Sequence, residues 1–348
     1  MQATATKRKT NADGKPLTRR LSKAGIDGFL ILLLTAVGVA YIAPATGAGQ
    51  GVFSLSSIAN CGISVIFFFY GLRLSRDKLR VGLGNWRLHI LIQLATFIIF
   101  PLLILLIRPF FAGDGNLMLW MGIFYAAALP STVSSSVVMV SIAKGNIPAA
   151  IFNASVSSLV GVFITPLWMS LMMAGHAGLD AHELGSVVAK LSLQVLLPVA
   201  AGMLLNRLWG SFAEKHKTAL RMFDQSIILL IVYTSFCSSF TNRVFDGVSA
   251  VALIFCAAGM VLLFFAVFGT VTFVCRRMKM NREDTITAQF CASKKSLVHG
   301  TAMSKVIFAG YSSAGLILLP IMLYHALQLM IVSAIAHKKG NECDIQRA

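Results

Sequence analysis

Charged residues are scarce in this sequence. They make up 12% of the 348 residues, and only 13 residues are Asp or Glu against 30 that are Lys or Arg. A water-soluble domain normally carries about twice this share of charge, so the composition excludes an ordinary soluble globular protein. Apolar stretches long enough to cross a bilayer instead recur along the whole chain, which is 57% hydrophobic.

The sequence also lacks the patterns of metal, redox and nucleotide sites. None of its six cysteines forms a CxxC pair, so neither a metal framework nor a disulfide scaffold is expected. No ATP-binding motif is present either. We therefore expect a protein without a cofactor, which is neither an enzyme nor a self-contained pump.

A single basic patch is absent as well, despite the formal net charge of +17. Nucleic-acid interfaces gather Lys and Arg into one patch or stripe. Here the basic residues are spread over short loops between the apolar stretches, so no nucleic-acid partner is expected. The environment predicted for this chain is the lipid bilayer.

Ten membrane-crossing stretches are predicted. They cover residues 27–44, 53–71, 88–107, 117–142, 147–173, 186–206, 225–241, 248–275, 284–309 and 313–336. With this division, 24 of the 30 Lys and Arg residues fall on one face of the membrane and three on the other. The remaining three, Lys294, Lys295 and Lys305, lie inside the ninth stretch. By the positive-inside rule both termini are predicted to be cytoplasmic, in a plasma membrane such as the bacterial inner membrane.

The ten stretches divide into two sets of five. The predicted units are a cytoplasmic basic tail (1–25), a first five-helix repeat (26–175), a second five-helix repeat (185–337) and a cytoplasmic tail (338–348). Because five is odd, the second set would be inverted relative to the first. The fourth stretch of each set is interrupted, at Ala128–Ser136 and at Ala292–Gly300. Matching interruptions in two halves indicate the binding site of a transporter.

The first interruption centres on Pro130. Proline lacks a backbone N–H and disfavours helical conformation at Leu129. Hydroxyl groups follow at Thr132, Ser135 and Ser136, where they can cap a restarted helix. The pattern favours a helix stop, a short unwound stretch and a second half-helix. A continuous helix kinked at the proline, with hydroxyls bonded to their own turn, is the alternative.

The second interruption carries two adjacent lysines, Lys294 and Lys295. A charged side chain at mid-bilayer costs at least ~2.5–3.5 kcal/mol, so it normally marks a functional interior site. None of the 13 acidic residues lies in mid-span to pair with them. Half-helix carbonyls, an anionic substrate or loss of the proton could each stabilise these amines. The alternative is that both side chains snorkel to the cytoplasmic edge.

Further polar residues in the spans are candidates for the same site. They are Ser293, Ser296 and His299 beside the lysines, and Gln93, Asn153 and Gln289 in the third, fifth and ninth spans. His299 is notable because imidazole can bind or release a proton near neutral pH. Taken singly, each of the amides is more typical of a hydrogen bond between helices than of a ligand.

Three stretches carry a family resemblance. Leu129–Ser136, Ala143–Asn146 and Cys291–Leu297, with the span count, resemble the sodium/bile acid cotransporter superfamily, in particular the SBF-like branch of bacterial symporter-like proteins related to the seventh vertebrate member. The resemblance covers residues 25–336. It implies an all-α membrane protein with ten transmembrane helices in two inverted five-helix repeats. Spans 1, 2, 6 and 7 would form a panel domain and spans 3–5 and 8–10 a core domain. The discontinuous helices 4 and 9 would cross near mid-membrane, and the substrate would bind between core and panel.

In the bile acid branch, two sodium ions lie behind that crossing. Matching the motifs places Ser135 and Ser136 where that branch has a Ser-Asn ligand pair. Asn153 falls at a ligand position of the fifth span, and Gln93 matches a glutamine of the third span. The resemblance therefore implies ligand positions at Ser135, Ser136 and Asn153.

The ninth span departs from the bile acid branch. Lys294 and Lys295 stand where that branch has a Gln-Asn pair, and nothing acidic stands at the position of its glutamate. An ammonium can take the place of a bound cation, and burial favours the neutral amine. We hypothesise that Lys294 or Lys295 replaces a sodium ion or exchanges a proton during transport.

The leading functional prediction is a symporter-like secondary active transporter of a small organic anion, which works by alternating access with sodium or a proton as possible coupling ion. The alternative is a non-transporting membrane regulator or assembly factor on a transporter fold. A channel is not supported, because the sequence has no repeated filter loop. An intramembrane protease is not supported either, because no complete GxSG motif is present. The sequence leaves the substrate, the direction of transport and the oligomeric state open.

Overall fold

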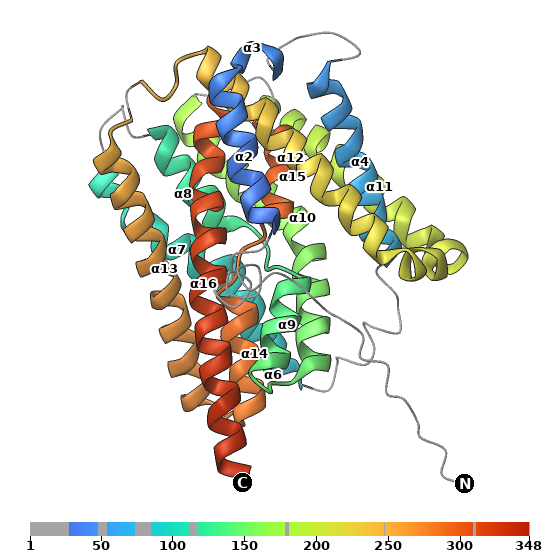
Figure 1. Cartoon of the computed structure of the whole chain (residues 1–348), viewed down its shortest axis with the longest axis vertical. Coiled ribbons are helices and arrows are strands. Elements are labelled where there is room, and N and C mark those ends of the chain that lie inside the picture. Colours follow the sequence, from blue (N-terminus) through green and yellow to red (C-terminus); the bar gives the residue numbers. More distant parts are fainter. Residues whose placement is uncertain are drawn as a thin grey trace, which may run out of the picture.

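A computed structural model of the chain describes residues 28–47, 54–73, 85–111, 117–177, 181–246, 248–308 and 311–347. In these ranges all regular structure is helical and no strand occurs (Figure 1). The predicted basic tail at residues 1–25 lies outside them. Six helical stretches are long and apolar enough to cross a membrane, namely Leu55–Arg73, Trp86–Leu106, Ile147–Met173, Lys217–Thr241, Ala250–Arg277 and Ala314–Cys343. The prediction of an all-helical membrane protein is confirmed.

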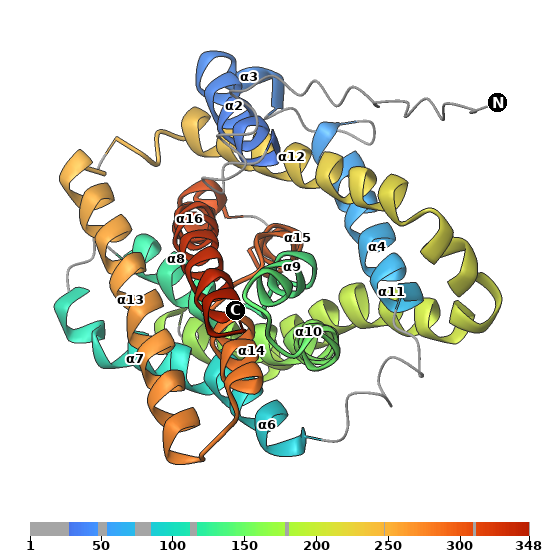
Figure 2. The same ribbon diagram turned by 60° about the horizontal axis from the view of Figure 1, so that its bottom comes forward.

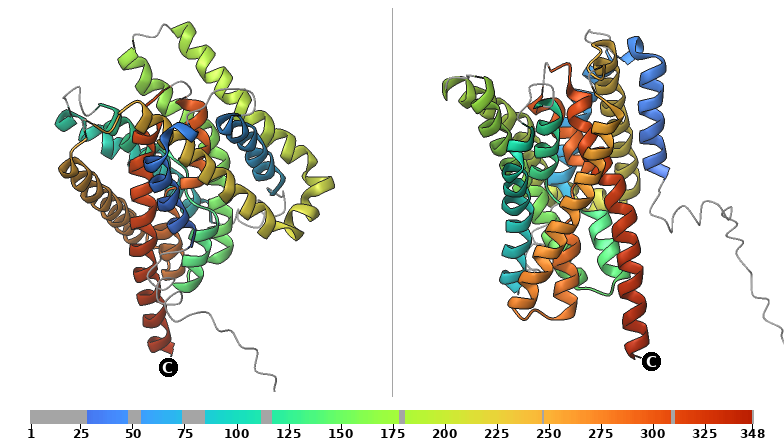
Figure 3. Two further views of the ribbon diagram at one scale, coloured as in Figure 1. Left: turned by 45° about the horizontal axis from the view of Figure 1, so that its top comes forward. Right: turned by 90° about the vertical axis from the view of Figure 1, so that its left-hand side faces the viewer.

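Each predicted stretch overlaps one helix or a run of two or three shorter helices. The first half of the chain forms α2 (Gly28–Ile42), α3 (Pro44–Gly47), α4 (Leu55–Arg73), α6 (Trp86–Leu94), η2 (Ala95–Ile99), α7 (Phe100–Leu106), η3 (Arg108–Phe111), α8 (Leu117–Ala128), α9 (Ser134–Ile142) and α10 (Ile147–Ala177). The second half forms α11 (Ala181–Lys215), α12 (Lys217–Thr241), α13 (Ala250–Arg277), α14 (Arg282–Ala292), α15 (Leu297–Ile307) and α16 (Ala314–Arg347). The predicted tail at residues 338–348 continues α16 as far as Arg347, past the ends of the other helices (Figure 3).

The helices form two groups. Helices α2, α4, α11 and α12 pack on one another along one side of the molecule and are called the side group here (Figure 2). Helices α6 to α10 and α13 to α16, with η2 and η3, form the central group. Segments far apart in the sequence lie side by side in each group, for example α4 with α11 and α8 with α16.

Helices α4 and α11 approach so closely that two glycines are required. A Cβ atom on Gly71 would lie 2.0 Å from the carbonyl oxygen of Val199, and one on Gly202 would lie 2.1 Å from that of Phe68. Small residues allow such close backbone contact between membrane helices, where van der Waals packing drives association. This contact joins two helices of the side group, although more than 120 residues separate them in the sequence.

We expect the substitution Gly71→Ala to destabilise the protein by about 1–3 kcal/mol, because the added methyl group overlaps a backbone carbonyl that cannot yield. The matched control is Gly269→Ala in α13, where a Cβ atom meets nothing within 4 Å. The control should be neutral or stabilising, since alanine favours helix over glycine by roughly 0.8–1 kcal/mol. Thermal unfolding of the purified variants measures both effects. Equal melting temperatures for the two variants would contradict the close approach.

Candidate functional site

Two helix breaks meet inside the central group. Helix α8 ends at Ala128 and α9 begins at Ser134, while α14 ends at Ala292 and α15 begins at Leu297. Both predicted interruptions are therefore present, and a continuous kinked helix is excluded at either place. The two breaks touch, because the backbone N–H of Ser296 donates to the carbonyl oxygen of Pro130 at 2.9 Å.

Helix α10 supplies partners for the unwound backbone of the first break. The hydroxyl of Ser157 accepts from the N–H of Ser131 at 2.9 Å, and the hydroxyl of Thr165 donates to the carbonyl of Ala128 at 2.8 Å. Gly161 lets α10 come this close, since a Cβ atom there would lie 2.6 Å from the Pro130 side chain. Non-helical backbone is tolerated at membrane depth only when the protein satisfies it in this way.

Lys295 lies in a cage of backbone carbonyls. Its side chain is 1% exposed, and its ammonium donates to the carbonyl oxygens of Thr96 (2.7 Å), Ala127 (2.6 Å) and Leu129 (2.8 Å). The ring centroid of Phe100 lies 4.1 Å from the same nitrogen, within the range of a cation–π contact. Three donors thus meet three acceptors, and the alternative that this lysine snorkels to the membrane edge is excluded.

The cage is built from carbonyls that the helices leave free. In η2, a short π-helix, the N–H of Phe100 bonds to the carbonyl of Ala95 rather than to that of Thr96. The Thr96 carbonyl is therefore available to the lysine. The other two acceptors belong to the C-terminal end of α8 and to the residue beyond it, where carbonyls lack intrahelical partners and carry the negative end of the helix dipole.

Helix α16 holds the backbone of the second break. The amide of Gln328 accepts from the N–H of Lys295 and donates to its carbonyl oxygen, both at 2.8 Å. The hydroxyl of Tyr324 donates to the carbonyl of Ser293 at 2.5 Å. These bonds fix where the lysine side chain leaves the main chain, so that it points toward the cage.

Lys294 has a different environment. Its side chain is fully buried, and its ammonium donates to the hydroxyl of Ser135 at 2.7 Å. That hydroxyl donates to Thr132 at 2.9 Å, and Thr132 bonds Ser136 at 2.8 Å. No other acceptor for this ammonium is found among the described residues. The hydroxyls expected to cap α9 therefore form a cluster that Lys294 joins with one of its three donors.

Neither lysine is neutralised by an acidic group. No carboxylate of the described residues lies within 4.0 Å of either ammonium. Of the three partners considered from the sequence, helix carbonyls are the observed partners of Lys295. Lys294 instead contacts a hydroxyl group and keeps hydrogen-bonding capacity.

Two other candidates from the sequence, His299 and Ser293, lie at the second break but have different partners. His299 borders the second break, where its Nδ1 bonds the Ser296 hydroxyl at 2.9 Å and its ring stacks on Tyr70 of α4 with centroids 4.7 Å apart. The Ser293 hydroxyl bonds the carbonyl of Gln289 at 2.6 Å, within its own helix turn. His299 therefore faces the side group, whereas Ser293 serves its own helix.

The three amide candidates make hydrogen bonds between helices. Gln93 donates to the backbone and side-chain oxygens of Asn153 at 3.3 and 3.4 Å, and Asn153 bonds Nδ1 of His89 at 2.8 Å. Gln289 donates to Thr272 of α13 at 2.7 Å. No hydrogen bond joins these amides to the lysine pair in the described part of the chain. The structure brings Gln93 and Asn153 together, and in the described part of the chain neither bonds a lysine ammonium.

Sequence reasoning missed several contributors to the site. Thr96 and Phe100 lie in an apolar stretch, and Thr96 contributes only a carbonyl, which every residue type has. A proline in mid-span, Pro101, was the available sign that this helix departs from regular geometry. Gln328 is polar and lies in mid-span, but nothing local indicates which backbone it binds.

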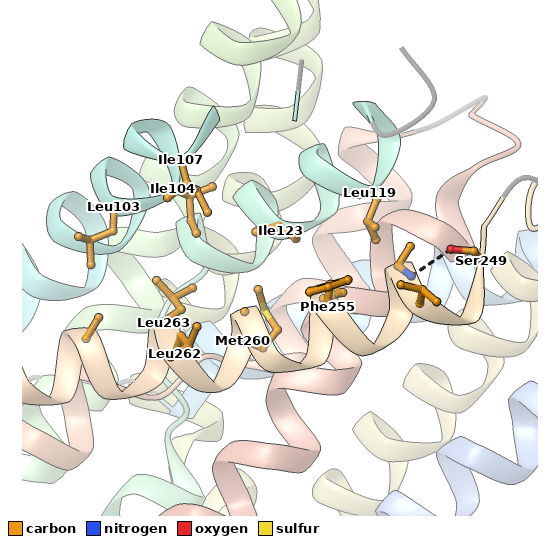
Figure 4. Close-up of a pocket in the computed structure, with 15 residues that line it drawn as sticks. Leu103, Ile104, Ile107, Leu119, Ile123, Ser249, Phe255, Met260, Leu262 and Leu263 are labelled. Atoms are coloured by element: carbon orange, nitrogen blue, oxygen red, sulfur yellow. Dashed lines mark hydrogen bonds between the residues drawn. The ribbon is translucent and has the colours of Figure 1, made fainter. Parts of the chain in front are cut away.

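A groove of about 590 Å³ lies elsewhere, between α7, α8 and α13 (Figure 4). Leu103, Ile123, Met260 and Leu263 are among its apolar lining residues, and neither lysine contributes to it. Phe255 at its edge is 73% exposed, as expected for a surface that contacts lipid tails. The groove is therefore distinct from the site at the helix breaks.

Residues 27–340 match the SBF-like CPA transporter family. The chain belongs to this family. It is 39% identical to the protein PA2026 of Pseudomonas aeruginosa over 318 residues, which cover 91% of this chain and 94% of that protein. It is 36% identical to the protein named Putative symporter YfeH of Escherichia coli over 315 residues, 90% and 92% of the two chains. Sodium/bile acid cotransporter 7 of Mus musculus is 29% identical over 322 residues, 91% and 93% of the two chains.

These matches confirm the resemblance inferred from the breaks. The chain is an integral membrane protein and a membrane transporter of the bile acid:sodium symporter-like family. A transporter family implies a small-molecule substrate, and the relatives do not indicate an enzyme.

We expect Lys295→Met to destabilise the protein by several kcal/mol, because three buried carbonyls lose their donor at about 1–3 kcal/mol each. Lys294→Met is the matched control. It removes one hydrogen bond to a hydroxyl, and that hydroxyl keeps Thr132 as a partner. Thermal unfolding in one detergent should show a much larger loss for Lys295→Met. Equal losses would contradict the different environments of the two lysines.

Proposed function

We propose that the protein is a secondary active transporter of a small organic anion, which works by alternating access in the plasma membrane. The observation that carries the proposal is the contact between two broken helices, with one buried lysine in a carbonyl cage and a second beside a hydroxyl cluster. Discontinuous helices that meet at mid-membrane are where transporters of this kind bind substrate and coupling ion. A bacterial symporter relative supports the inner membrane as the location.

The proposed topology has ten transmembrane helices in two inverted five-helix repeats, with both termini in the cytoplasm. The pairs α8–α9 and α14–α15 then count as one span each, the fourth of the first repeat and the fourth of the second. The side group corresponds to the panel domain, and the central group to the core domain. The distribution of Lys and Arg supports the orientation.

Lys295 acts in this proposal as a tethered cation. Carbonyls at half-helix ends commonly hold Na⁺ in transporters with broken helices. Here the ammonium of Lys295 donates to carbonyl oxygens of the same kind. No acidic residue of the described chain forms an ion pair with it, so no carboxylate is available there to hold an additional cation. A fixed charge in this position would remove the need for a sodium ion behind the crossing.

Lys294 is the better candidate for proton exchange. Its single hydrogen bond can survive loss of the proton, because a neutral amine still donates to Ser135. Lys295 would leave one carbonyl without a donor if it lost its proton, so its charged form is held by the cage. From the sequence, either lysine could replace a sodium ion or exchange a proton. In this proposal Lys295 replaces the ion and Lys294 exchanges the proton.

The preference for an anion follows from the charge of the site. Half-helices α9 and α15 both begin at the breaks, so their positive ends face the same region. The adjacent ionisable side chains are amines rather than carboxylates. An anionic substrate would balance this positive character.

The packing between the groups supports alternating access. Half-helix α15 packs on α11 and α12 of the side group, whereas the main partners of α9 and α14 lie in the central group. With the proposed orientation, the groups are joined in the outer half of the membrane. This arrangement is the one expected of a state closed to the outside.

A second candidate function is a membrane regulator or assembly factor that uses a transporter fold without transport. The observation that favours it is the lysine in place of a bound cation, because a permanently filled ion site removes one means of coupling transport to an ion gradient. A scaffold of this kind should bind no small anion.

A thermal-shift screen of organic anions, crossed with Na⁺, Li⁺ and K⁺ at several pH values, separates the two functions. We expect at least one anion to raise the unfolding temperature, since a ligand at 100 times its Kd stabilises by about 2.7 kcal/mol. The choice of alkali cation should have no effect at constant ionic strength. Stabilisation by Na⁺ alone would contradict the tethered cation, and stabilisation by no anion would favour the scaffold.

The variant Lys295→Ala tests the tethered cation directly. It should be less stable than the wild type and should regain stability in ethylammonium, which can place an ammonium among the same three carbonyls. Lys294→Ala should gain no such stability, and the neutral analogue ethanol should rescue neither variant. Lack of rescue by any cation would count against the cation role of the cage.

Transport by the variants Lys294→Gln and Lys295→Gln, measured in proteoliposomes with an anion from the screen, tests the roles of the lysines. We expect Lys295→Gln to lose transport and Lys294→Gln to change its dependence on pH, because the exchangeable proton is removed. If both variants keep full transport and an unchanged pH profile, neither lysine takes part in coupling.

A further inference from the structure

One face of α4 points across the boundary between the two groups. Tyr70 and Arg73 are three residues apart and so share this face. The Tyr70 ring stacks on His299 of α15, with an angle of 26° between the planes, and Cζ of Arg73 lies 5.9 Å from the centre of the Tyr70 ring. Arg73 is therefore placed near the second helix break, although it belongs to the side group.

Arg73 uses only one edge of its guanidinium. Its Nη1 donates to Oδ2 of Asp224 in α12 at 3.0 Å. Its Nε and Nη2 are buried from solvent and have no hydrogen-bond partner among the described residues. The guanidinium is planar, and these two nitrogens are neighbours on the same side of it.

This free edge has the geometry that recognises an oxyanion. Two parallel N–H groups of arginine match the two oxygens of a carboxylate, which gives a bidentate contact. A buried donor of a charged group is unfavourable without an acceptor. The carboxylate of Asp224 does not supply the second contact, because it meets the guanidinium through a single nitrogen.

We propose that the Nε–Nη2 edge of Arg73 binds the carboxylate group of the transported anion. This inference rests on the proposed function and deepens it, since it names a residue and a substrate class, the organic carboxylates. Asp224 holds the guanidinium from the other side. The aromatic stack of Tyr70 and His299 lies beside the bound group and links it to the broken helix.

The location suits a substrate that must move between two sides of a membrane. Arg73 and Asp224 both belong to the side group, whereas His299 belongs to the central group and follows the break directly. A carboxylate on Arg73 would thus lie at the boundary between the two groups. Relative movement of the groups would change its surroundings while the Arg73–Asp224 pair stays intact.

Thermal unfolding of the purified full chain tests the proposal with benzoate, succinate and glycocholate as probes, each as its choline salt, and benzamide as the neutral control. At least one carboxylate should stabilise the wild type, and benzamide should not. Arg73→Gln should weaken the apparent affinity at least tenfold, and Arg73→Lys should restore little because lysine lacks the planar pair of donors. The matched control, Arg277→Gln in α13, changes an arginine whose side chain lies over Phe273 and should leave the affinity unchanged.

A second measurement covers the case in which Arg73 variants do not fold. Phenylglyoxal modifies arginine, and a bound carboxylate should protect Arg73 of the wild type while Arg277 stays reactive, as read by peptide mass spectrometry. The role of Arg73 would be overturned if one carboxylate stabilised Arg73→Gln and the wild type with equal affinity. It would also be overturned if no carboxylate protected Arg73 from phenylglyoxal. Either result would leave the proposed transport function standing. Stabilisation of the wild type by none of the carboxylates would overturn both.

Discussion

The arrangement of the central group depends on one buried ammonium. Lys295 joins the end of α8, the π-helical turn η2 and the start of the α15 half-helix, which belong to three different spans. Without it, carbonyls from two of those spans would face a membrane interior without donors. The cost of burying the charge is offset because all three N–H groups find acceptors and a ring face lies against them. The same bonds tie the two helix breaks to η2 of a third span.

The neighbouring Lys294 shows that two adjacent lysines can have different hydrogen-bond partners and therefore different protonation chemistry. Lys294 and Lys295 are adjacent in the chain and equally buried, yet one meets backbone carbonyls and the other a hydroxyl. Carbonyls only accept hydrogen bonds, so they favour the charged amine. A hydroxyl can donate or accept, so it tolerates either form of the amine. A fixed positive charge and an exchangeable one can therefore stand next to each other.

The boundary between the two groups has two notable features: an aromatic stack that joins them, and an arginine beside this stack with unpaired donors in the described structure. The Tyr70–His299 stack joins α4 to the half-helix after the break, and Nε and Nη2 of the neighbouring Arg73 are buried without an acceptor among the described residues. The side group is held by glycine contacts that bring α4 and α11 together, and by the Arg73–Asp224 pair between α4 and α12. It can therefore act as one body. Movement between the groups would change the stack and not these internal contacts.

The sequence by itself determined the membrane class, the helical stretches and the places where two of them are interrupted. These properties depend on hydropathy, on the missing N–H of Pro130 and on charges that have no neighbour of opposite sign, all of which are local. It also placed both lysines and the hydroxyl cluster in one candidate site. Only the tertiary structure decided that Lys295 has three carbonyl partners, that Gln93 and Asn153 pair with each other, and that Arg73 lies near the second break. A backbone carbonyl is the same in every residue, so its availability depends on how distant helices end and pack, which no local pattern records.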